Sequence, residues 1–85
     1  MAFEVYIHKK AERKLDKIRD IGLKERLKNA FKLLSEPFSL DTVEMEDEES
    51  TYRTRIGRYR VLWVLEKGVV YIVDFDTREK AYKGR

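Results

Sequence analysis

The sequence predicts a small α+β domain in which an antiparallel β-sheet packs against an N-terminal helical hairpin. Two apolar stripes with helical spacing come early in the chain, and three strand-like segments joined by tight turns come late. Amphipathic helices and a one-sided sheet each need an apolar surface to cover, so the helical pair is expected on one face of the sheet. Eighty-five residues are enough for one such core, and we expect a single domain over residues 1–85.

The N-terminal half is expected to hold one strand and two helices. Phe3, Val5 and Ile7 alternate with more polar neighbours, as in a strand with one buried face. A first helical stripe consists of Ala11, Leu15 and Ile18, and Asp20-Ile21-Gly22 is expected to break that helix. A wider stripe follows at Leu23, Leu27, Ala30, Phe31 and Leu34. Pro37 is expected to end this second helix.

Residues 37–50 show no sustained period and are predicted to form an exposed loop. Five carboxylates crowd its second half: Glu44, Glu46, Asp47, Glu48 and Glu49. Without a histidine, or a glycine that sets the loop geometry, such a run is usually a solvated loop and not a metal site. We therefore expect no metal and no other cofactor.

The most informative segment is a predicted β-hairpin around Gly57-Arg58, a glycine-first turn of the type II′ pattern. Such a turn would fix four cross-strand pairs: Ile56 with Tyr59, Arg55 with Arg60, Thr54 with Val61, and Tyr52 with Trp63. Strand alternation then gives an apolar face of Tyr52, Thr54, Ile56, Tyr59, Val61 and Trp63. The opposite surface, here called the arginine face, consists of Arg53, Arg55 and Arg60. Lys67-Gly68 is expected to make the next tight turn, and residues 69–75 a strand that is apolar on both faces and therefore central.

The arginine face predicts an anion site. Like charges across a hairpin repel each other, so three guanidinium groups on one patch suggest a surface that awaits a negative ligand. A planar fork of donors with permanent charge suits phosphate. The net charges of segments 1–36, 37–50 and 51–85 are +4, −6 and +5, which suits a polyanion or an acidic partner segment. The alternative is a solvated surface laced with ion pairs.

The composition also indicates the cellular compartment and the class of protein. The chain has no cysteine, which is compatible with a reducing compartment. No apolar run approaches the roughly 20 residues that span a bilayer, and no signal segment opens the sequence, so a soluble cytoplasmic protein is expected. Standard catalytic motifs are missing, and the single histidine, His8, is better explained as a surface or helix-capping residue than as a base.

The remaining candidates favour chemistry on RNA. Arginine cannot act as a base near pH 7, but it can stabilise the charge that grows on a phosphate during transfer. RNA carries its own nucleophile, the 2′-hydroxyl, so a protein can promote scission by alignment and charge stabilisation without a metal. Arg78 and Tyr82 stand four residues apart near the C-terminus, and Tyr82 could stack on a base.

These features resemble the RelE family of toxins from toxin–antitoxin pairs, in the wider RelE/ParE superfamily. The resemblance rests on the strand–helix–helix order, the segment Tyr52 to Trp63 and the closing Arg78-Glu79-Lys80-Ala81-Tyr82, and it covers essentially the whole chain. It implies a metal-independent endoribonuclease that cuts mRNA in the ribosomal A site and so inhibits translation. It also implies a RelB-like antitoxin as partner, in an oligomeric toxin–antitoxin complex.

The resemblance also implies roles for single residues. Arg53 and Arg55 would assist 2′-hydroxyl activation or stabilise the transition state, and Arg60 would contact the scissile phosphate. Arg78 would stabilise the leaving group or donate a proton to it, and Tyr82 would stack on the nucleotide. Further RNA contacts are expected from Arg58, Lys80 and Lys83.

The chain departs from the family pattern in several respects, one of which is that residues 44–49 are acidic where relatives often carry lysines. Arginines stand where lysines are common, and Thr77 stands where many members carry histidine, so the identity of the general base is open. Two other functions on the same fold therefore remain as alternatives. One is a ParE-like toxin that poisons a topoisomerase, and the other is a catalytically impaired member that only binds its antitoxin.

Overall fold

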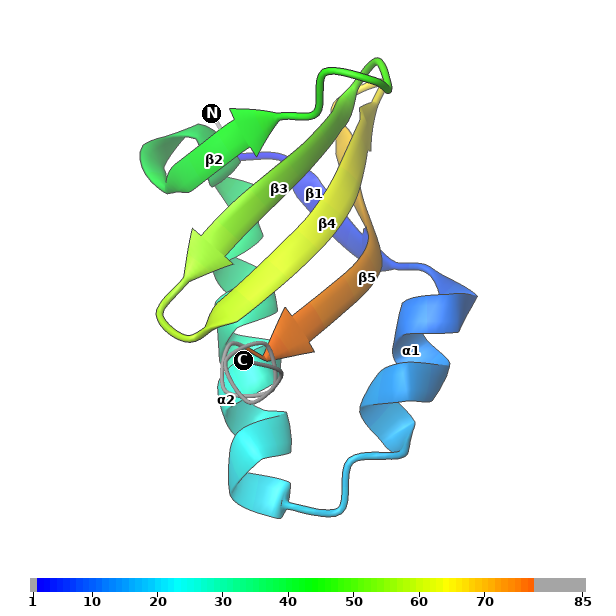
Figure 1. Cartoon of the computed structure of the whole chain (residues 1–85), viewed down its shortest axis with the longest axis vertical. Helices are drawn as coiled ribbons and strands as arrows, with labels where there is room; N and C mark the ends of the chain where they lie inside the picture. The colour runs from blue at the N-terminus through cyan, green and yellow to red at the C-terminus, as the bar shows by residue number, and fades with distance from the viewer. Residues whose placement is uncertain (1, 78–85) are drawn as a thin grey trace.

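The computed structural model describes residues 2–77 and has two helices against one face of a five-stranded sheet (Figure 1). The helices are α1 (Lys9–Asp16) and α2 (Ile21–Lys32), and α2 runs behind the sheet in the view of Figure 1. The strands are β1 (Glu4–Ile7), β2 (Asp41–Glu44), β3 (Thr51–Ile56), β4 (Tyr59–Glu66) and β5 (Val69–Thr77). The predicted α+β class is confirmed.

The sheet is mixed and not purely antiparallel, which corrects the prediction. Its strand order is β1-β5-β4-β3-β2, and β1 pairs with β5 in parallel, from Glu4 opposite Val69 to Ile7 opposite Ile72. Alternation in a sequence shows which side chains of a strand share a face, but not which strand lies beside it or in which direction. The predicted internal position of β5 is confirmed, since it lies between β1 and β4.

The hairpin prediction is confirmed in both register and faces. Ile56 pairs with Tyr59, Arg55 with Arg60, Thr54 with Val61, and Tyr52 with Trp63. Gly57 has φ +59°, as the first position of a type II′ turn requires, and a side chain there would be strained. At the next turn both Lys67 and Gly68 have positive φ, the type I′ pattern.

The helix boundaries differ from those predicted. α1 ends at Asp16, so Ile18 packs on the core from the connecting segment. Asp20 starts α2 instead of breaking a helix, because its carboxylate accepts a hydrogen bond from the Leu23 N–H at 3.1 Å. Beyond Lys32 the chain tightens into a 3₁₀ turn over Leu33–Ser35, so the helical segment stops before Pro37.

Residues 37–50 are not all loop, which is a second correction. A 3₁₀ turn at Pro37–Ser39 leads into β2, a short strand that pairs antiparallel with β3 at the edge of the sheet. Thr42 is the one residue of this strand that is not exposed, and its hydroxyl forms a hydrogen bond with the Thr54 hydroxyl of β3. A single residue that is not exposed produces no alternation of apolar and polar residues in the sequence. The strand is therefore defined by its pairing with β3 and not by a local sequence pattern.

The core lies between the apolar face of the sheet and the helices. Its fully buried side chains include Ala11, Leu27, Leu34, Val61, Trp63, Val70 and Ile72. No helix within residues 2–77 is long and apolar enough to cross a membrane.

Candidate functional site

The arginine face lies on the side of the sheet that the helices leave open. Cross-strand pairing aligns four charged residues in one row over four strands, in the order Asp41, Arg55, Arg60 and Asp76. Neighbours in such a row have Cβ atoms about 4.5 to 5.5 Å apart. Two guanidinium groups thus stand side by side with a carboxylate at each end.

The next row on this face pairs Val43 with Arg53, Arg53 with Leu62, and Leu62 with Asp74. Arg53 and Arg55 are exposed and Arg60 is half-buried. Within residues 2–77, no carboxylate lies within ion-pair distance of these three arginines. Their donors are therefore available for an external anion.

Two hollows open on the arginine face. The smaller, of about 130 Å³, is lined by Asp41, Val43, Arg53, Arg55 and Arg60. The larger, of about 300 Å³, extends toward α1 and is lined in part by Lys14, Arg53, Arg60, Asp74 and Asp76. Because Arg53 and Arg60 border both hollows, an extended polyanion could follow the face while keeping contact with this pair.

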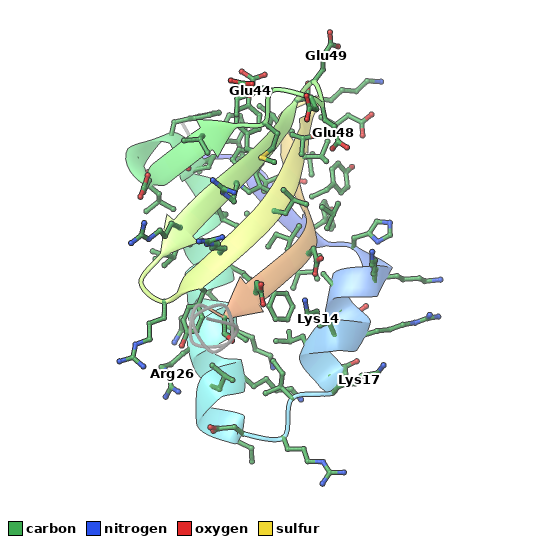
Figure 2. The ribbon with its side chains drawn as sticks, in the orientation of Figure 1. Lys14, Lys17, Arg26, Glu44, Glu48 and Glu49 are labelled. Atoms are coloured by element: carbon green, nitrogen blue, oxygen red, sulfur yellow. The ribbon has the colours of Figure 1, made fainter. Side chains whose placement is uncertain are left out.

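Lys14 closes the α1 side of the larger hollow. Figure 2 shows it directed from α1 toward β5, where its ammonium group donates to Asp74 Oδ1 at 3.0 Å and to the Phe75 carbonyl oxygen. β1 covers the edge of β5 only as far as Ile72, so Lys14 satisfies a carbonyl that has no strand beside it. Partial burial raises the pKa of Asp74, but hydrogen bonds from Lys14 and the Phe75 N–H together with nearby lysine charge outweigh it, and the net pKa is lowered.

A β-bulge brings the two aspartates of β5 onto this face. Trp63 pairs with Ile72 while the preceding Leu62 pairs with Asp74, so Val73 is an extra residue in β5. Ile72, before the bulge, and Phe75, three positions later and after the bulge, are both buried. The extra residue reverses the alternation, and Asp74 and Asp76 therefore share the face of Arg60.

A buried hydrogen-bond chain fixes the strands beneath the arginines. Trp63 Nε1 donates to Thr54 Oγ1 at 2.7 Å, Thr54 and Thr42 join their hydroxyls at 2.7 Å, and Thr42 Oγ1 donates to the Pro37 carbonyl at 2.7 Å. Each hydroxyl has one proton, so Thr54 is the donor to Thr42. The chain links β4, β3, β2 and the preceding turn, and so holds in place the strands that carry Asp41, Arg55 and Arg60.

Comparison with known families identifies the protein class. The family model that describes the ParE toxin of the parDE type II toxin–antitoxin system matches residues 5–82. The chain belongs to this toxin family. Comparison with curated proteins gave no match.

Solved structures relate this RelE/ParE toxin to RelE proteins. It is similar to a chain of the RelBE2 toxin–antitoxin complex of Mycobacterium tuberculosis, with 28% identity, a TM-score of 0.71, and coverage of 92% of this chain and 100% of that one. It is also similar to a chain of the RelE–RelB complex of Pyrococcus horikoshii, with 26% identity, a TM-score of 0.69, and coverage of 92% and 97%. A mutant of the Escherichia coli toxin RelE in the free state shares the fold at 16% identity, with a TM-score of 0.67 and coverage of 96% and 90%.

The structure brings together three of the residues predicted for the site of this toxin, namely Arg53, Arg55 and Arg60. Arg58 lies apart from them, at the turn, where it borders a hollow with Arg26 and Tyr59 next to α2. Arg26 Nε donates to the Tyr59 hydroxyl at 3.2 Å, which ties α2 to the start of β4. Predictions for Arg78, Lys80, Tyr82 and Lys83 fall outside the described residues.

Two other sequence interpretations have a structural counterpart. His8 caps α1, with Nδ1 accepting a hydrogen bond from the Lys10 N–H at 3.2 Å, as expected for a capping residue. Glu44, Glu48 and Glu49 lie at the end of the sheet remote from the β3–β4 turn (Figure 2). Asp41 lies opposite Arg55 and Glu44 follows three residues later in β2, so the acidic segment begins about 10 Å from Arg55.

Three carboxylates of the site were not predicted from the sequence. Asp41 belongs to the strand that was expected to be loop, and Asp74 and Asp76 reach the arginine face only through the bulge. The sequence carried one sign of the bulge. Ile72 and Phe75 are both apolar but three positions apart, which does not fit the period of two of a regular strand. Among residues 2–77, no group of three potential ligands is arranged to hold a metal ion.

Proposed function

We propose that this toxin is a RelE-like endoribonuclease that cleaves mRNA in the ribosomal A site and so stops translation. The observation that carries the proposal is the arginine face, where three guanidinium groups share one open surface with no carboxylate, within residues 2–77, in ion-pair distance. A surface of this kind suits a phosphodiester backbone, which needs several donors and no particular base.

The chemistry follows from what arginines can and cannot do. They orient the scissile phosphate and stabilise the extra negative charge of its transition state. The 2′-hydroxyl of the RNA is the nucleophile, so the products are a 2′,3′-cyclic phosphate and a 5′-hydroxyl. Alignment and charge stabilisation are supplied by the protein, and the step requires no metal ion.

A RelB-like antitoxin is the proposed partner, and the cytoplasm the proposed location. Two of the similar structures are RelE–RelB complexes, which supports a partner of this type. Large apolar side chains remain exposed at Tyr6, Ile21, Leu33, Phe38 and Val43. A partner that covers some of these side chains would gain free energy from their burial. We expect the toxin–antitoxin complex to be oligomeric.

A ParE-like topoisomerase poison is the second candidate. The matching family model is that of ParE toxins, and three aspartates share the arginine face and lower its positive potential. A member that only binds its antitoxin is the third candidate. In both cases the fold and the antitoxin partner would be kept, while RNA cleavage would be absent.

The deciding experiment is induction of the toxin in cells, with protein and DNA synthesis followed by radiolabelled precursors. The proposed function predicts that protein synthesis stops first, and an initial stop in DNA synthesis would support the topoisomerase candidate. Purified toxin with mRNA-programmed ribosomes should then yield a 2′,3′-cyclic phosphate and should fail on a 2′-deoxy scissile nucleotide. Cleavage should persist after chelation of metal ions in ribosomes crosslinked beforehand, with their integrity checked by sedimentation.

A further inference from the structure

The general base that sequence comparison leaves open has a candidate next to Arg60. Asp76 lies directly opposite Arg60 in the β4–β5 ladder, and its side chain is exposed on the arginine face. One carboxylate oxygen accepts a hydrogen bond from the Thr77 N–H at 3.0 Å, which orients the group. Within residues 2–77, the carboxylate has no further hydrogen bond and no ion pair, so its other oxygen is available.

The other groups near the arginines are less suitable as bases. Asp74 forms an ion pair with Lys14, and its Oδ1 accepts hydrogen bonds from both Lys14 and the Phe75 N–H, so this carboxylate is stabilised in its charged form and is a poorer proton acceptor. Asp41 lies beside Arg55 at the other end of the row, two strand spacings or about 9 to 10 Å from Arg60. Thr77 borders the hollow of Arg26 and Tyr59 next to α2, so a basic side chain at that position would not share the face of Arg60 in this conformation.

We propose that Asp76 is the general base of RNA cleavage, an inference that rests on the proposed function. Asp76 removes the proton from the 2′-hydroxyl while Arg60 holds a non-bridging oxygen of the adjacent phosphate. The 2′-oxygen forms a bond to phosphorus, the bond from phosphorus to the 5′-oxygen breaks, and the departing oxygen takes a proton from water. Asp76 then releases its proton to solvent, and no oxidant, reductant or metal enters the balance.

The test compares four variants in single-turnover cleavage of mRNA on ribosomes. Asp76→Asn should slow cleavage by about 10² to 10⁴-fold, the usual contribution of a general base, and Asp76→Glu should recover part of the rate. Asp41→Asn removes the same charge from the opposite end of the same row and so measures the effect of the field alone. Asp47→Asn, which changes an exposed carboxylate away from the arginine face, is the control that should cleave at the wild-type rate. If the aspartates only weaken the field of the arginines, both Asp76→Asn and Asp41→Asn should bind RNA better and cleave at least as fast as wild type.

A modified substrate separates a base from an acid. Sulfur in place of the bridging 5′-oxygen gives a leaving group that needs no proton, so the defect of Asp76→Asn should persist if Asp76 acts on the 2′-hydroxyl. Restoration of the rate by the sulfur would overturn the proposal and assign Asp76 to the leaving group.

The outcome also distinguishes this inference from the proposed function. Wild-type cleavage that Arg60→Ala abolishes but Asp76→Asn leaves intact would refute the role of Asp76 alone. Absence of cleavage by the wild-type protein would refute both the proposed endoribonuclease function and the role of Asp76. Circular dichroism of each variant should match that of wild type, because Asp76 is exposed and its only hydrogen bond within residues 2–77 is to its own neighbour.

Discussion

Replacing Thr54 with valine tests the hydrogen-bond chain beneath the arginine face. Thr54 and Trp63 are both fully buried, and the Thr54 hydroxyl accepts from the indole N–H and donates to Thr42. Valine has nearly the same shape as threonine but offers no polar atom. The substitution therefore leaves the indole N–H without an acceptor while the surrounding packing stays the same.

The cost can be estimated from these contacts. A buried donor that loses its partner costs about 1 to 3 kcal/mol, and no water can replace the hydroxyl if the site stays filled. The Thr42 hydroxyl still donates to Pro37, so most of the cost falls on Trp63. We expect a loss of about 2 kcal/mol, or a fall in Tm of about 8 to 16 °C at about 4 to 8 °C per kcal/mol for a domain of this size.

Urea and thermal unfolding followed by fluorescence suit this test, since Trp63 is the only tryptophan in the chain. Thr51→Val is the matched control, because Thr51 is also buried in β3 but its hydroxyl makes only a long bond, of 3.3 Å, to the Glu49 carbonyl. It should cost less than about 1 kcal/mol. Equal losses in the two variants, or a Thr54→Val protein as stable as wild type, would show that the chain contributes nothing specific.

Two further substitutions probe the site itself. Arg60→Ala should reduce the rate of mRNA cleavage on ribosomes by about 10² to 10³-fold and change the free energy of unfolding by only about 0.5 kcal/mol. Arg19→Ala is the control, because it removes an exposed arginine between the helices. It should preserve both the cleavage rate and the melting temperature. Lys14 helps to lower the pKa of Asp74 in the folded protein below its ordinary value of 3.8. The stability gained in this way is present above pH 3.8 and is lost as the pH falls through the folded-state pKa, so Lys14→Met should destabilise the protein most at neutral pH. Urea melts at pH 7 and pH 3 should show the gap between variant and wild type narrowing in acid, and a constant gap would contradict this account.

Local sequence patterns were sufficient to predict those parts of the fold that depend on residues close together in the chain. The Gly57-Arg58 turn has two residues, and this length together with a side-chain period of two fixes every pair between β3 and β4. The arginine face follows directly from that register. The wide stripe of α2 likewise predicted its buried residues, and the resemblance of the whole chain to RelE toxins pointed to the family that the comparison then established.

Tertiary structure decided which elements lie beside one another. The pairing of β1 with β5 and of β2 with β3 joins segments whose order along the chain does not specify neighbours or direction. The bulge in β5 depends on Ile72 and Phe75 both packing into the core, which the strand alone does not require. The arginines of the site could therefore be predicted from the sequence, whereas Asp41, Asp74 and Asp76 could not. Those carboxylates reach the site only through long-range strand pairing and one extra residue in β5.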